Sequence, residues 1–561
     1  MAMFDRRREH KQTFDESRTI NVTIRESSNV GGHIEYRIEI WRSPEPEVRY
    51  SLTYRYSQFA HLNFALRSPH VTLPVLPPKK FFGNTDKSFV NDRKVALQNY
   101  MDELTKHPIL RHHQALKNFC DPINYCANQL ENGMMSVAAV LRSGGRLELG
   151  NTMHSIGWRY HKQYFHVCQV TPASTTDSTA SVASGGAGST ATGDSVSTTG
   201  SASAVRGSSS STTSNTSSPE LTSAALAHTL HVAPPKASLL LWWCPYGVDS
   251  TMHLRDVHGT LTALVQCQHP YLATTLSSVA TETGVCVTMP FYPQGSLRDL
   301  LYGARPDQSY IVKYNSNKST SQSLACGISI RSAAVYGRQM LTALNFLHHK
   351  SVGHGHVHLG NVVVVEGVCR LGGAENLVLG LPHPLRFLFT YVKSLNSIQA
   401  IDVYCFGHML YEMAMRRQLS TPTCEVFPAD CPPLCRSVLE SILSPEAGKN
   451  GMPTIDGLLT HPFFNEIPLH SHGRVSLHMS ASVKQAVLTA HQTMLSRLLS
   501  DQKKVRLQKR IQKAEALIAQ QSYRFTGRNK EANKKTGSKS AGATPPSSTI
   551  TSPGTSSKGD L

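Results

Sequence analysis

The sequence predicts an α+β chain of several domains, in which a small antiparallel sheet with helices precedes a larger domain of mixed structure. Three observations lead to this prediction. The chain has 561 residues, which is enough for two or three domains. Strand-type alternation comes early in the chain, and long helical patterns come later. Low-complexity segments interrupt these patterns and mark their boundaries.

The first domain should contain paired strands, a proline-rich loop and then helices. We expect residues 1–17 to be disordered, and their first ten, MAMFDRRREH, lack the apolar core of a signal peptide. The segments HIEYRIEIW (33–41) and VRYSLTYRY (48–56) alternate with a period of two, as strands do. In the first of them, one face carries Ile34, Tyr36, Ile38 and Ile40. The loop LPVLPPKKFF and the helical stretch VNDRKVALQNYMDEL follow.

Residues 18–125 resemble a PX domain, the module that binds phosphoinositides, through the motifs RYSQF, LPPKK and LQNYM. The resemblance implies that Arg55 binds the 3-phosphate of the lipid and that Tyr56 lies against the inositol ring. It also implies that Lys79 contacts the 1-phosphate and that Arg93 contacts the 4- and 5-hydroxyls. Arginine binds phosphate oxygens bidentately and lysine acts as a point charge, so these residue types suit the chemistry. Taken singly, each could be a solvated surface charge; together they favour phosphatidylinositol 3-phosphate.

Two aromatic residues follow the lysines of this loop directly. Phe81 and Phe82 come after Lys79 and Lys80, so the loop presents cations with apolar rings beside them. In PX domains this loop lies at the membrane. We therefore expect Phe81 and Phe82 to insert into the bilayer, and the alternative is that one of them faces inward.

Residues 126–470 resemble a bilobal protein kinase domain. The motifs VTMPFYPQGSLRDLLYG, YGRQMLTALNFLHHKS, DVYCFGHMLYEM and IDGLLTHPFF match its hinge and the helices of its C-lobe. Helical spacing places Met340, Leu344 and Leu347 on one face. The same spacing groups Val403, Phe406, Leu410 and Met413. The resemblance implies that Asp402 accepts hydrogen bonds from the backbone of the catalytic loop.

The residues that a kinase needs for phosphoryl transfer are replaced in this chain. The loop HGHVHLGN keeps His354 and Asn361, but His356 stands where the catalytic aspartate belongs. Gly373 replaces the metal-binding aspartate, His358 replaces the usual loop lysine, and the third strand, SLLLWWCP, has no lysine. We therefore predict a pseudokinase with no cofactor, and leave residual ATP binding open.

Three substitutes for the missing groups stay conceivable. His356 could accept a proton when it is neutral. Lys162, on the expected second strand, could reach the phosphates, and Glu375 could approach a metal. Alternating histidines could also converge on zinc, although no cysteine- or carboxylate-rich segment offers a fourth ligand. We favour the interpretation that the histidine loop is kept for its shape.

The remaining segments have simpler compositions. Residues 171–225 form a Ser/Thr/Gly/Ala-rich insertion between two expected strands, and we expect it to be disordered. Residues 483–520 have helical spacing with a basic stretch, KKVRLQKR. This helix either packs on the preceding domain or binds a membrane or a partner. We expect the basic, Ser- and Pro-rich tail, residues 523–561, to be disordered.

Charge and cysteine content limit the possible functions. The formal net charge of +18 favours anionic partners such as acidic lipid. The basic residues are spread out and no nucleic-acid-binding signature occurs, so we expect no nucleic acid partner. The 12 cysteines are scattered, which suggests a reducing compartment, and no apolar run is long enough to span a membrane. We expect a cytoplasmic protein that contacts membranes peripherally.

The order of the two domains resembles the PX-domain kinase-like family. That family implies a non-catalytic adaptor on endosomal and plasma membranes, with roles in receptor trafficking. It also implies binding of endocytic cargo and of the β subunit of the Na,K-ATPase. The C-terminal segment TPPSSTITSPGTSSKGDL shows no clear actin-binding counterpart, so actin binding is doubtful. The alternative function is an atypical active Ser/Thr kinase that its PX domain recruits to membranes.

Overall fold

The computed structural model describes residues 18–67, 71–80, 85–107, 110–122, 128–144, 147–153, 162–169, 238–306, 308, 313, 328–469 and 475–536. Several predictions fall outside these residues. They concern the N-terminus (1–17), the residues Phe81 and Phe82, the insertion (171–225) and the end of the tail (537–561).

The first domain is built on a three-stranded antiparallel sheet in the order β1-β2-β3. Its strands are β1 (Ile20–Val30), β2 (His33–Arg42) and β3 (Glu45–Arg55). Gly31 and Gly32 have φ angles of 57° and 84°, which a tight turn between β1 and β2 requires. The alternation predicted for β2 is confirmed, because Tyr36, Ile38 and Ile40 are completely buried.

Helical elements complete the described part of this domain. They are α2 (Tyr56–Leu66), α3 (Lys87–Lys106), η1 (Leu110–His112) and α4 (Gln114–Cys120). The strand predicted for residues 48–56 ends one residue early, at Arg55, and Tyr56 already begins α2. The reason is that the buried side chains after Tyr56 follow a helical period, with Phe59, Leu62 and Leu66 on one face.

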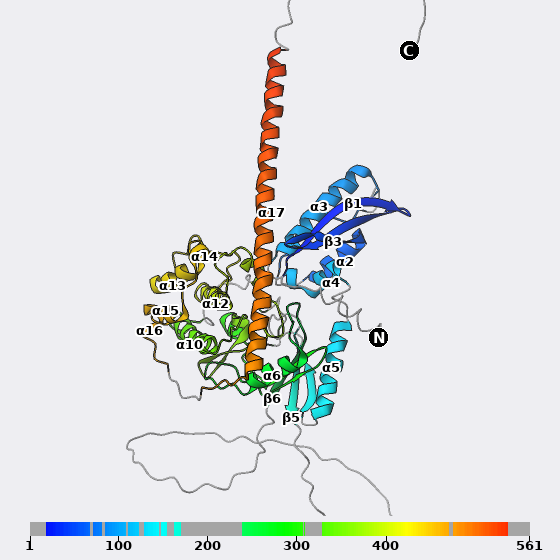
Figure 1. Cartoon of the computed structure of the whole chain (residues 1–561). Coiled ribbons are helices and arrows are strands. Elements are labelled where there is room, and N and C mark those ends of the chain that lie inside the picture. Colours follow the sequence, from blue (N-terminus) through cyan, green and yellow to red (C-terminus); the bar gives the residue numbers. More distant parts are fainter. Residues whose placement is uncertain are drawn as a thin grey trace, which may run out of the picture.

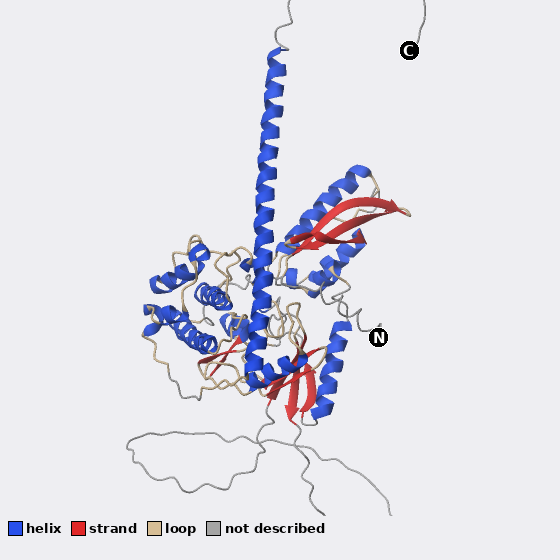
Figure 2. Cartoon of the chain, viewed as in Figure 1, coloured by secondary structure: helices blue, strands red, loops and turns tan. Residues whose placement is uncertain are grey.

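The second domain begins with a lobe that contains a five-stranded antiparallel sheet, order β4-β5-β6-β8-β7 (Figure 2). The strands are β4 (Leu147–Thr152), β5 (Gln163–Gln169), β6 (Ser238–Pro245), β7 (Ser277–Ala280) and β8 (Gly284–Pro290). Helix α5 (Asn128–Gly144) packs on one face, where Phe165 and Trp243 join its Val137. Helix α6 (Leu254–Val265) packs on the other face with Trp242.

The second lobe is mainly helical. Its longer helices are α10 (Ile330–His349), α12 (Ile398–Met415) and α13 (Pro433–Leu443). Shorter elements are α7 (Leu297–Leu301), η2 (Leu359–Asn361), β9 (Val362–Val365), β10 (Val368–Leu371), α11 (Arg386–Phe389), α14 (Ala447–Asn450), α15 (Ile455–Leu459) and α16 (Pro462–Asn465). The predicted faces of α10 and α12 are buried. Helix α12 is in fact buried all round, including Asp402 and His408, so it forms the centre of the lobe.

A 56-residue helix, α17 (Ala481–Thr536), runs along the lobes and then projects beyond them (Figure 1). Val487, Met494 and Leu498 are buried against the lobes, so the first part of the helix packs on the preceding domain. The helix predicted for 483–520 is therefore present but longer. The expectation of disorder from residue 523 is wrong up to Thr536. No proline occurs in this stretch, and its lysines, arginines, glutamate and single alanine favour helix.

Helix α17 also contacts the first domain. Buried Asp501 lies 3.4 Å from the guanidinium of Arg18 and 3.5 Å from that of Arg386, so one carboxylate joins both domains. Gln508 donates a hydrogen bond to the carbonyl of Pro44 (2.7 Å). A direct contact between the domains comes from Arg111, whose guanidinium carbon lies 4.6 Å from the ring centroid of Phe387.

Candidate functional site

The lipid-site candidates of the first domain gather where β3 passes into α2. Arg55 is the last residue of β3 and Tyr56 the first of α2, so the two side chains are fixed by a strand end and a helix start. The backbone N–H of Arg55 donates to the side chain of Gln58 (2.8 Å), which stabilises the first helical turn. The local turn therefore orients both residues.

Arg93 lies beneath this corner and is 7% exposed. Its guanidinium carbon lies 4.4 Å from the ring centroid of Tyr56 and 4.3 Å from that of Phe89. Its Nη2 donates to the carbonyl of Pro78 (3.1 Å), and the hydroxyl of Tyr56 donates to that of Pro77. Stacking between the two aromatic rings and the hydrogen bond to Pro78 hold the guanidinium in one orientation.

These contacts bring together the proline loop and three of the predicted residues. Tyr56 and Arg93 hold the carbonyls of Pro77 and Pro78, and Lys79 follows these prolines in the chain. The Nε of Arg93 is buried and makes no hydrogen bond to any described residue.

Arg55 is exposed and weakly paired. Its Nε lies 3.4 Å from Oε1 of Glu35, and about half of its side chain is accessible. A hydrogen bond from His33, and to a smaller degree one from Arg55, lowers the pKa of Glu35, so this carboxylate is charged at neutral pH. An exposed pair of this length contributes little free energy. Arg55 can therefore exchange Glu35 for a phosphate.

One exposed apolar residue of the proline loop was not predicted from the sequence. Val75 is 87% exposed, while its neighbours Leu73 and Leu76 pack against the domain core. The flanking prolines were the available signal, because they keep this stretch extended and let alternate side chains point outward. Lys80 lies close by, with its Nζ 4.2 Å from the ring centroid of Phe89. Phe81 and Phe82 are not among the described residues.

In the second domain, the loop His354–Asn361 keeps the shape of a catalytic loop. Asp402 accepts hydrogen bonds from the backbone N–H groups of His354 (2.9 Å) and Gly355 (2.6 Å), the contact that the resemblance implies. Its third partner is the Nε2 of His348 (2.9 Å). Burial raises the pKa of Asp402, but these hydrogen bonds and the nearby histidines bring it below its usual value. The carboxylate is therefore charged and shapes the loop.

The ring of His356 is engaged in a hydrogen bond in this arrangement. Its side chain is buried, and its Nε2 lies 2.7 Å from the carbonyl of Leu381. A carbonyl only accepts, so Nε2 carries the ring proton. Burial lowers the pKa of His356 to about 3, which keeps the ring neutral. The amide of Asn361 is likewise engaged, because it donates to the carbonyl of His356 (2.9 Å).

Gly373 occupies a backbone conformation that favours glycine. Its φ is 89°, and a Cβ at this position would lie 2.8 Å from Nδ2 of Asn376 and 2.9 Å from Nδ2 of Asn361. An aspartate introduced here would therefore strain the backbone and crowd both amides. Glycine therefore suits the backbone and the neighbours at this position.

The two other substitutes for missing catalytic groups lie together. Nζ of Lys162 is 3.1 Å from Oε1 of Glu375, and both side chains are buried. The same Nζ lies 3.6 Å from the ring centroid of Trp242. Burial raises the pKa of Glu375, but Lys162 and local hydrogen bonds lower it overall, so the pair is ionic. Each group thus neutralises the other. The sequence gives no sign of this pairing.

The segment after Gly373 closes onto the sheet-containing lobe. Leu379 and Leu381 share a core cluster with Trp242 and Leu261. The backbone of Gly247 donates to the carbonyl of Leu379 (2.9 Å), so the two lobes are also joined by backbone hydrogen bonds. A segment that moves in active kinases is here part of the packed core.

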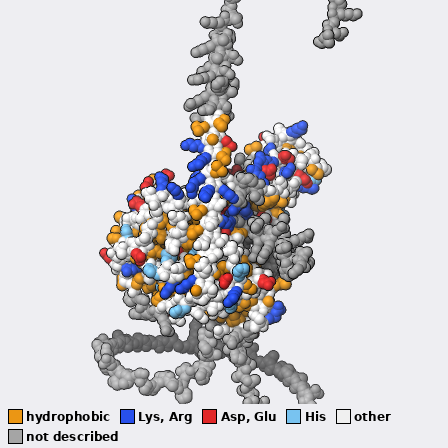
Figure 3. Space-filling view, viewed as in Figure 1, with side chains coloured by type: hydrophobic (Ala, Val, Ile, Leu, Met, Phe, Trp, Pro, Cys, Tyr) orange, Lys and Arg blue, Asp and Glu red, His pale blue; other side chains and the backbone are white. Residues whose placement is uncertain are grey.

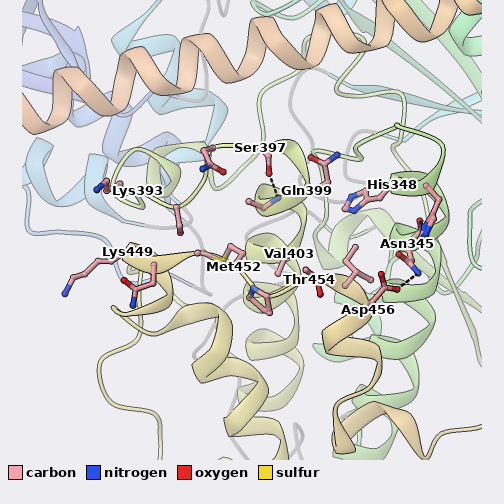
Figure 4. A pocket seen from close by; sticks show the side chains of 18 residues that line it. Asn345, His348, Lys393, Ser397, Gln399, Val403, Lys449, Met452, Thr454 and Asp456 are labelled. Carbon is pink, nitrogen blue, oxygen red and sulfur yellow. Dashed lines mark hydrogen bonds between the residues drawn. The ribbon is translucent and has the colours of Figure 1, made fainter.

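A polar groove of about 640 Å³ lies elsewhere on the helical lobe (Figure 4). It is bordered by the end of α10, the start of α12 and the segment Lys449–Ile455. Its charged residues include Lys393, Lys449 and Asp456, and none of the charged lining side chains is buried. The groove therefore has the character of an open surface depression and is distinct from the histidine loop.

Within the described ranges, no three His, Cys, Asp or Glu side chains are grouped so that they could hold a metal ion. In the same ranges, no helix combines the length and apolar character that crossing a bilayer requires.

Comparison with known proteins finds similar sequences for both domains. The family described as "PX domain" matches residues 44–122. A mouse protein named "PX domain-containing protein kinase-like protein" is 30% identical over 516 residues, which cover 92% of this chain and 77% of that protein. The Drosophila melanogaster "Slowpoke-binding protein" is 37% identical over 138 residues, 24% of this chain and 25% of that protein. A Dictyostelium discoideum "Probable inactive serine/threonine-protein kinase slob2" is 30% identical over 237 residues, 41% of this chain and 39% of that protein.

Proposed function

This chain belongs to the family of PX domain-containing protein kinase-like proteins, and from that premise we propose that it is a peripheral membrane adaptor. Its PX domain binds phosphoinositide, with phosphatidylinositol 3-phosphate as the preferred lipid. Its kinase-like domain serves as a scaffold and transfers no phosphoryl group. The observation that best supports the lipid site is the cluster in which Arg93, Tyr56 and the proline loop hold one another beside Arg55.

The roles within the lipid site are proposed from the family resemblance. It assigns Arg93, which Tyr56 and Pro78 hold in place, to the ring hydroxyls, while exposed Arg55 and Lys79 supply the charge that meets the phosphates. Phe81 and Phe82 then insert beside the headgroup. Serine at both positions should weaken binding to liposomes and spare binding of the soluble headgroup.

Liposome co-sedimentation with and without phosphatidylinositol 3-phosphate tests the lipid site. Arg55→Ala should lower the lipid-specific affinity at least about tenfold, since a charge-assisted contact to phosphate contributes about 1.5–3 kcal/mol. Arg49→Ala is the matched control, because Arg49 is another arginine of β3 and pairs with Glu39 on the sheet (3.2 Å). Equal losses in both variants would mean that only net charge matters and would refute the site.

The proposed absence of phosphoryl transfer is supported by the contacts of the residues that could replace a catalytic group. The ring N–H of His356 donates to a backbone carbonyl, Glu375 is paired with Lys162, and Gly373 carries no carboxylate. Incubation of the full chain with labelled ATP and magnesium should give no transfer to generic substrates or to the chain. Magnesium-dependent labelling that is lost in Lys162→Ala or His356→Ala protein would instead establish the alternative, an atypical active kinase.

We also propose that the partners are membrane transport proteins and endocytic cargo at endosomal and plasma membranes. The family resemblance supports the β subunit of the Na,K-ATPase, and one relative is named for binding Slowpoke. Co-precipitation of the full chain with the β subunit from solubilised membranes tests this. Arg55→Ala should reduce recovery from intact membranes and not from detergent solution. Absence of the β subunit under both conditions would exclude it as a partner.

A further inference from the structure

The free part of α17 carries an apolar stripe that no described residue covers. Leu507, Ile511 and Ile518 are 58%, 47% and 66% exposed. At 3.6 residues per turn, these three positions fall within about 40° of one another around the helix axis. They lie about 140° away from Val487, Met494 and Leu498, which pack on the lobes. The stripe therefore faces away from the side by which α17 is attached.

Basic residues flank this stripe. From Lys503 to Ile518 the helix has six Lys or Arg residues and one acidic residue, Glu515. Some of these cations also contact the protein, since Lys509 lies 4.4 Å from the ring centroid of Tyr391 and Arg506 bonds to Gln502. Figure 3 shows hydrophobic and basic side chains next to one another on the part of α17 that leaves the lobes.

We propose that residues 503–518 of α17 bind the surface of an anionic bilayer, with Leu507, Ile511 and Ile518 in the interface and the flanking lysines and arginines at the lipid headgroups. An exposed apolar stripe with basic borders is the pattern of helices that lie in the membrane interface. Long basic side chains can place their stems along the apolar region and their charges among acidic headgroups.

Charge and pattern favour a bilayer over a second copy of this chain. A parallel copy would place six cations of one helix beside six of the other, which is unfavourable. A coiled coil also needs an apolar repeat over three or more heptads. Beyond Ile518, the positions that continue the stripe are Gln521, Phe525 and Arg528, so polar residues interrupt it on both sides of Phe525. The stripe is long enough for contact with a membrane and too short for a stable zipper.

The position of residues 503–518 in the fold also favours a membrane as the partner. Gln508, in the middle of this segment, is hydrogen-bonded to Pro44 of the PX domain. The segment therefore lies beside the domain proposed to bind phosphoinositide, and both parts can meet one membrane. The inference takes its choice of partner from the proposed membrane role and needs no phosphoinositide at the PX site. Two linked contacts raise the residence of the chain on the membrane by increasing the effective concentration of each.

The test uses the full chain and phosphatidylcholine vesicles with and without phosphatidylserine, free of phosphoinositide. The stripe variant is Ile511→Asp with Ile518→Asp. The matched control is Gln512→Asp with Ala516→Asp, which adds the same charge at two exposed positions on the other side of the helix. Thermal unfolding of all proteins establishes that they are folded.

We expect wild-type chain to bind phosphatidylserine vesicles and to lose this binding at high salt. The stripe variant should bind at least about tenfold more weakly, and the control should stay within about threefold of wild type. Arg55→Ala should bind these vesicles as wild type does, which separates this contact from the PX site. Equal binding by stripe and control variants, or no binding by wild type, would overturn the proposal. So would a wild-type dimer that the stripe variant dissociates, because a second copy would then cover the stripe.

Discussion

Asp402 is the residue whose removal should do most damage to the kinase-like domain. Its buried carboxylate accepts from the backbone N–H groups of His354 and Gly355. In Asp402→Ala protein both donors are left buried without a partner, each at a cost of about 1–3 kcal/mol. We expect a loss of about 3 kcal/mol or more in the free energy of unfolding.

Urea unfolding with hydrogen exchange of the helical lobe measures this loss. Asp456→Ala is the control, since Asp456 is exposed and bonds only to Asn345 among the described contacts of its side chain (3.0 Å). That variant should change stability by less than about 0.5 kcal/mol. Similar losses in the two variants would show that Asp402 does not organise the loop.

Buried histidines should make the chain sensitive to acid. Burial lowers the pKa of His356 and His408 to about 3 and that of His491 to about 4. The unfolded chain binds protons on these rings near the ordinary pKa of about 6.5. Their contribution to stability is therefore fully present above about pH 6.5 and is lost progressively as the pH falls toward their folded pKa values.

Between about pH 7.5 and about pH 5.5, each of these histidines should cost on the order of 1 kcal/mol. Thermal unfolding as a function of pH measures the effect. His408→Leu should make the dependence shallower, and His258→Leu, at an exposed position, should leave it unchanged. A melting temperature that is constant over this range would contradict the expectation.

At the scale of elements, the pairing of β5 with β6 predicts that the insertion between them can be removed. The two strands are antiparallel, and Cys168 is paired with Ser238. Replacing residues 169–237 by Asn-Gly would join these partners by a two-residue turn of the kind that hairpins favour. The sheet would lose Gln169, an exposed residue at the end of β5, and its two cores would keep all their described side chains.

We expect this shortened chain to melt within about 3 °C of the full chain, which corresponds to about 1 kcal/mol. Val167→Asp serves as the positive control, because Val167 lies completely buried in the same strand and a charge there should unfold the lobe. A fall of many degrees on shortening would mean that residues 169–237 contribute to the packed structure.

Elements with a clear hydrophobic period could be predicted from the sequence. The alternation of β2 and the helical spacing of α3, α10 and α12 depend on neighbouring residues alone. The end of β3 was misplaced because Tyr56 continues the alternation while already starting α2. The end of helix α17 was also misplaced. The composition of the tail suggested disorder from residue 523, but a stretch without proline can continue a helix.

The candidate sites could be predicted only as separate residues. Lys162 and Glu375 are 213 positions apart, and their ion pair arises from the way the two lobes close. The hydrogen bond from His356 to Leu381 likewise depends on the segment that packs under Trp242. Long-range pairings of this kind have no periodic signal, so the sequence left open substitutes for catalysis that the structure finds occupied.

At the scale of the whole molecule, α17 acts as the part that ties the domains together. Arg386 lies between two buried aspartates, 3.9 Å from Asp249 and 3.5 Å from Asp501. Arg497 of α17 pairs with Asp249 (2.7 Å), and Arg18 of the first domain with Asp501. Buried charges need such partners, because an unpaired one costs several kcal/mol. The network therefore couples the position of α17 to both domains.

This coupling predicts that one truncation of the chain lowers its stability and that another does not. Ending the chain at residue 480 removes α17 and uncovers the apolar surface that Val487, Met494 and Leu498 bury, at about 1.5–3 kcal/mol for each side chain. It also leaves Asp249 and Arg386 without two of their partners. We expect this chain to melt many degrees lower and to aggregate in size-exclusion chromatography.

Ending the chain at residue 520 should leave both properties unchanged. That truncation keeps every described buried side chain of α17 and also the stripe that ends at Ile518. The shortened chain should therefore melt as the full chain does and still bind phosphatidylserine vesicles. If the chain that ends at residue 480 is monomeric and equally stable, α17 is an appendage and does not tie the domains together. If the chain that ends at residue 520 is destabilised, residues beyond the packed part of the helix contribute to the fold.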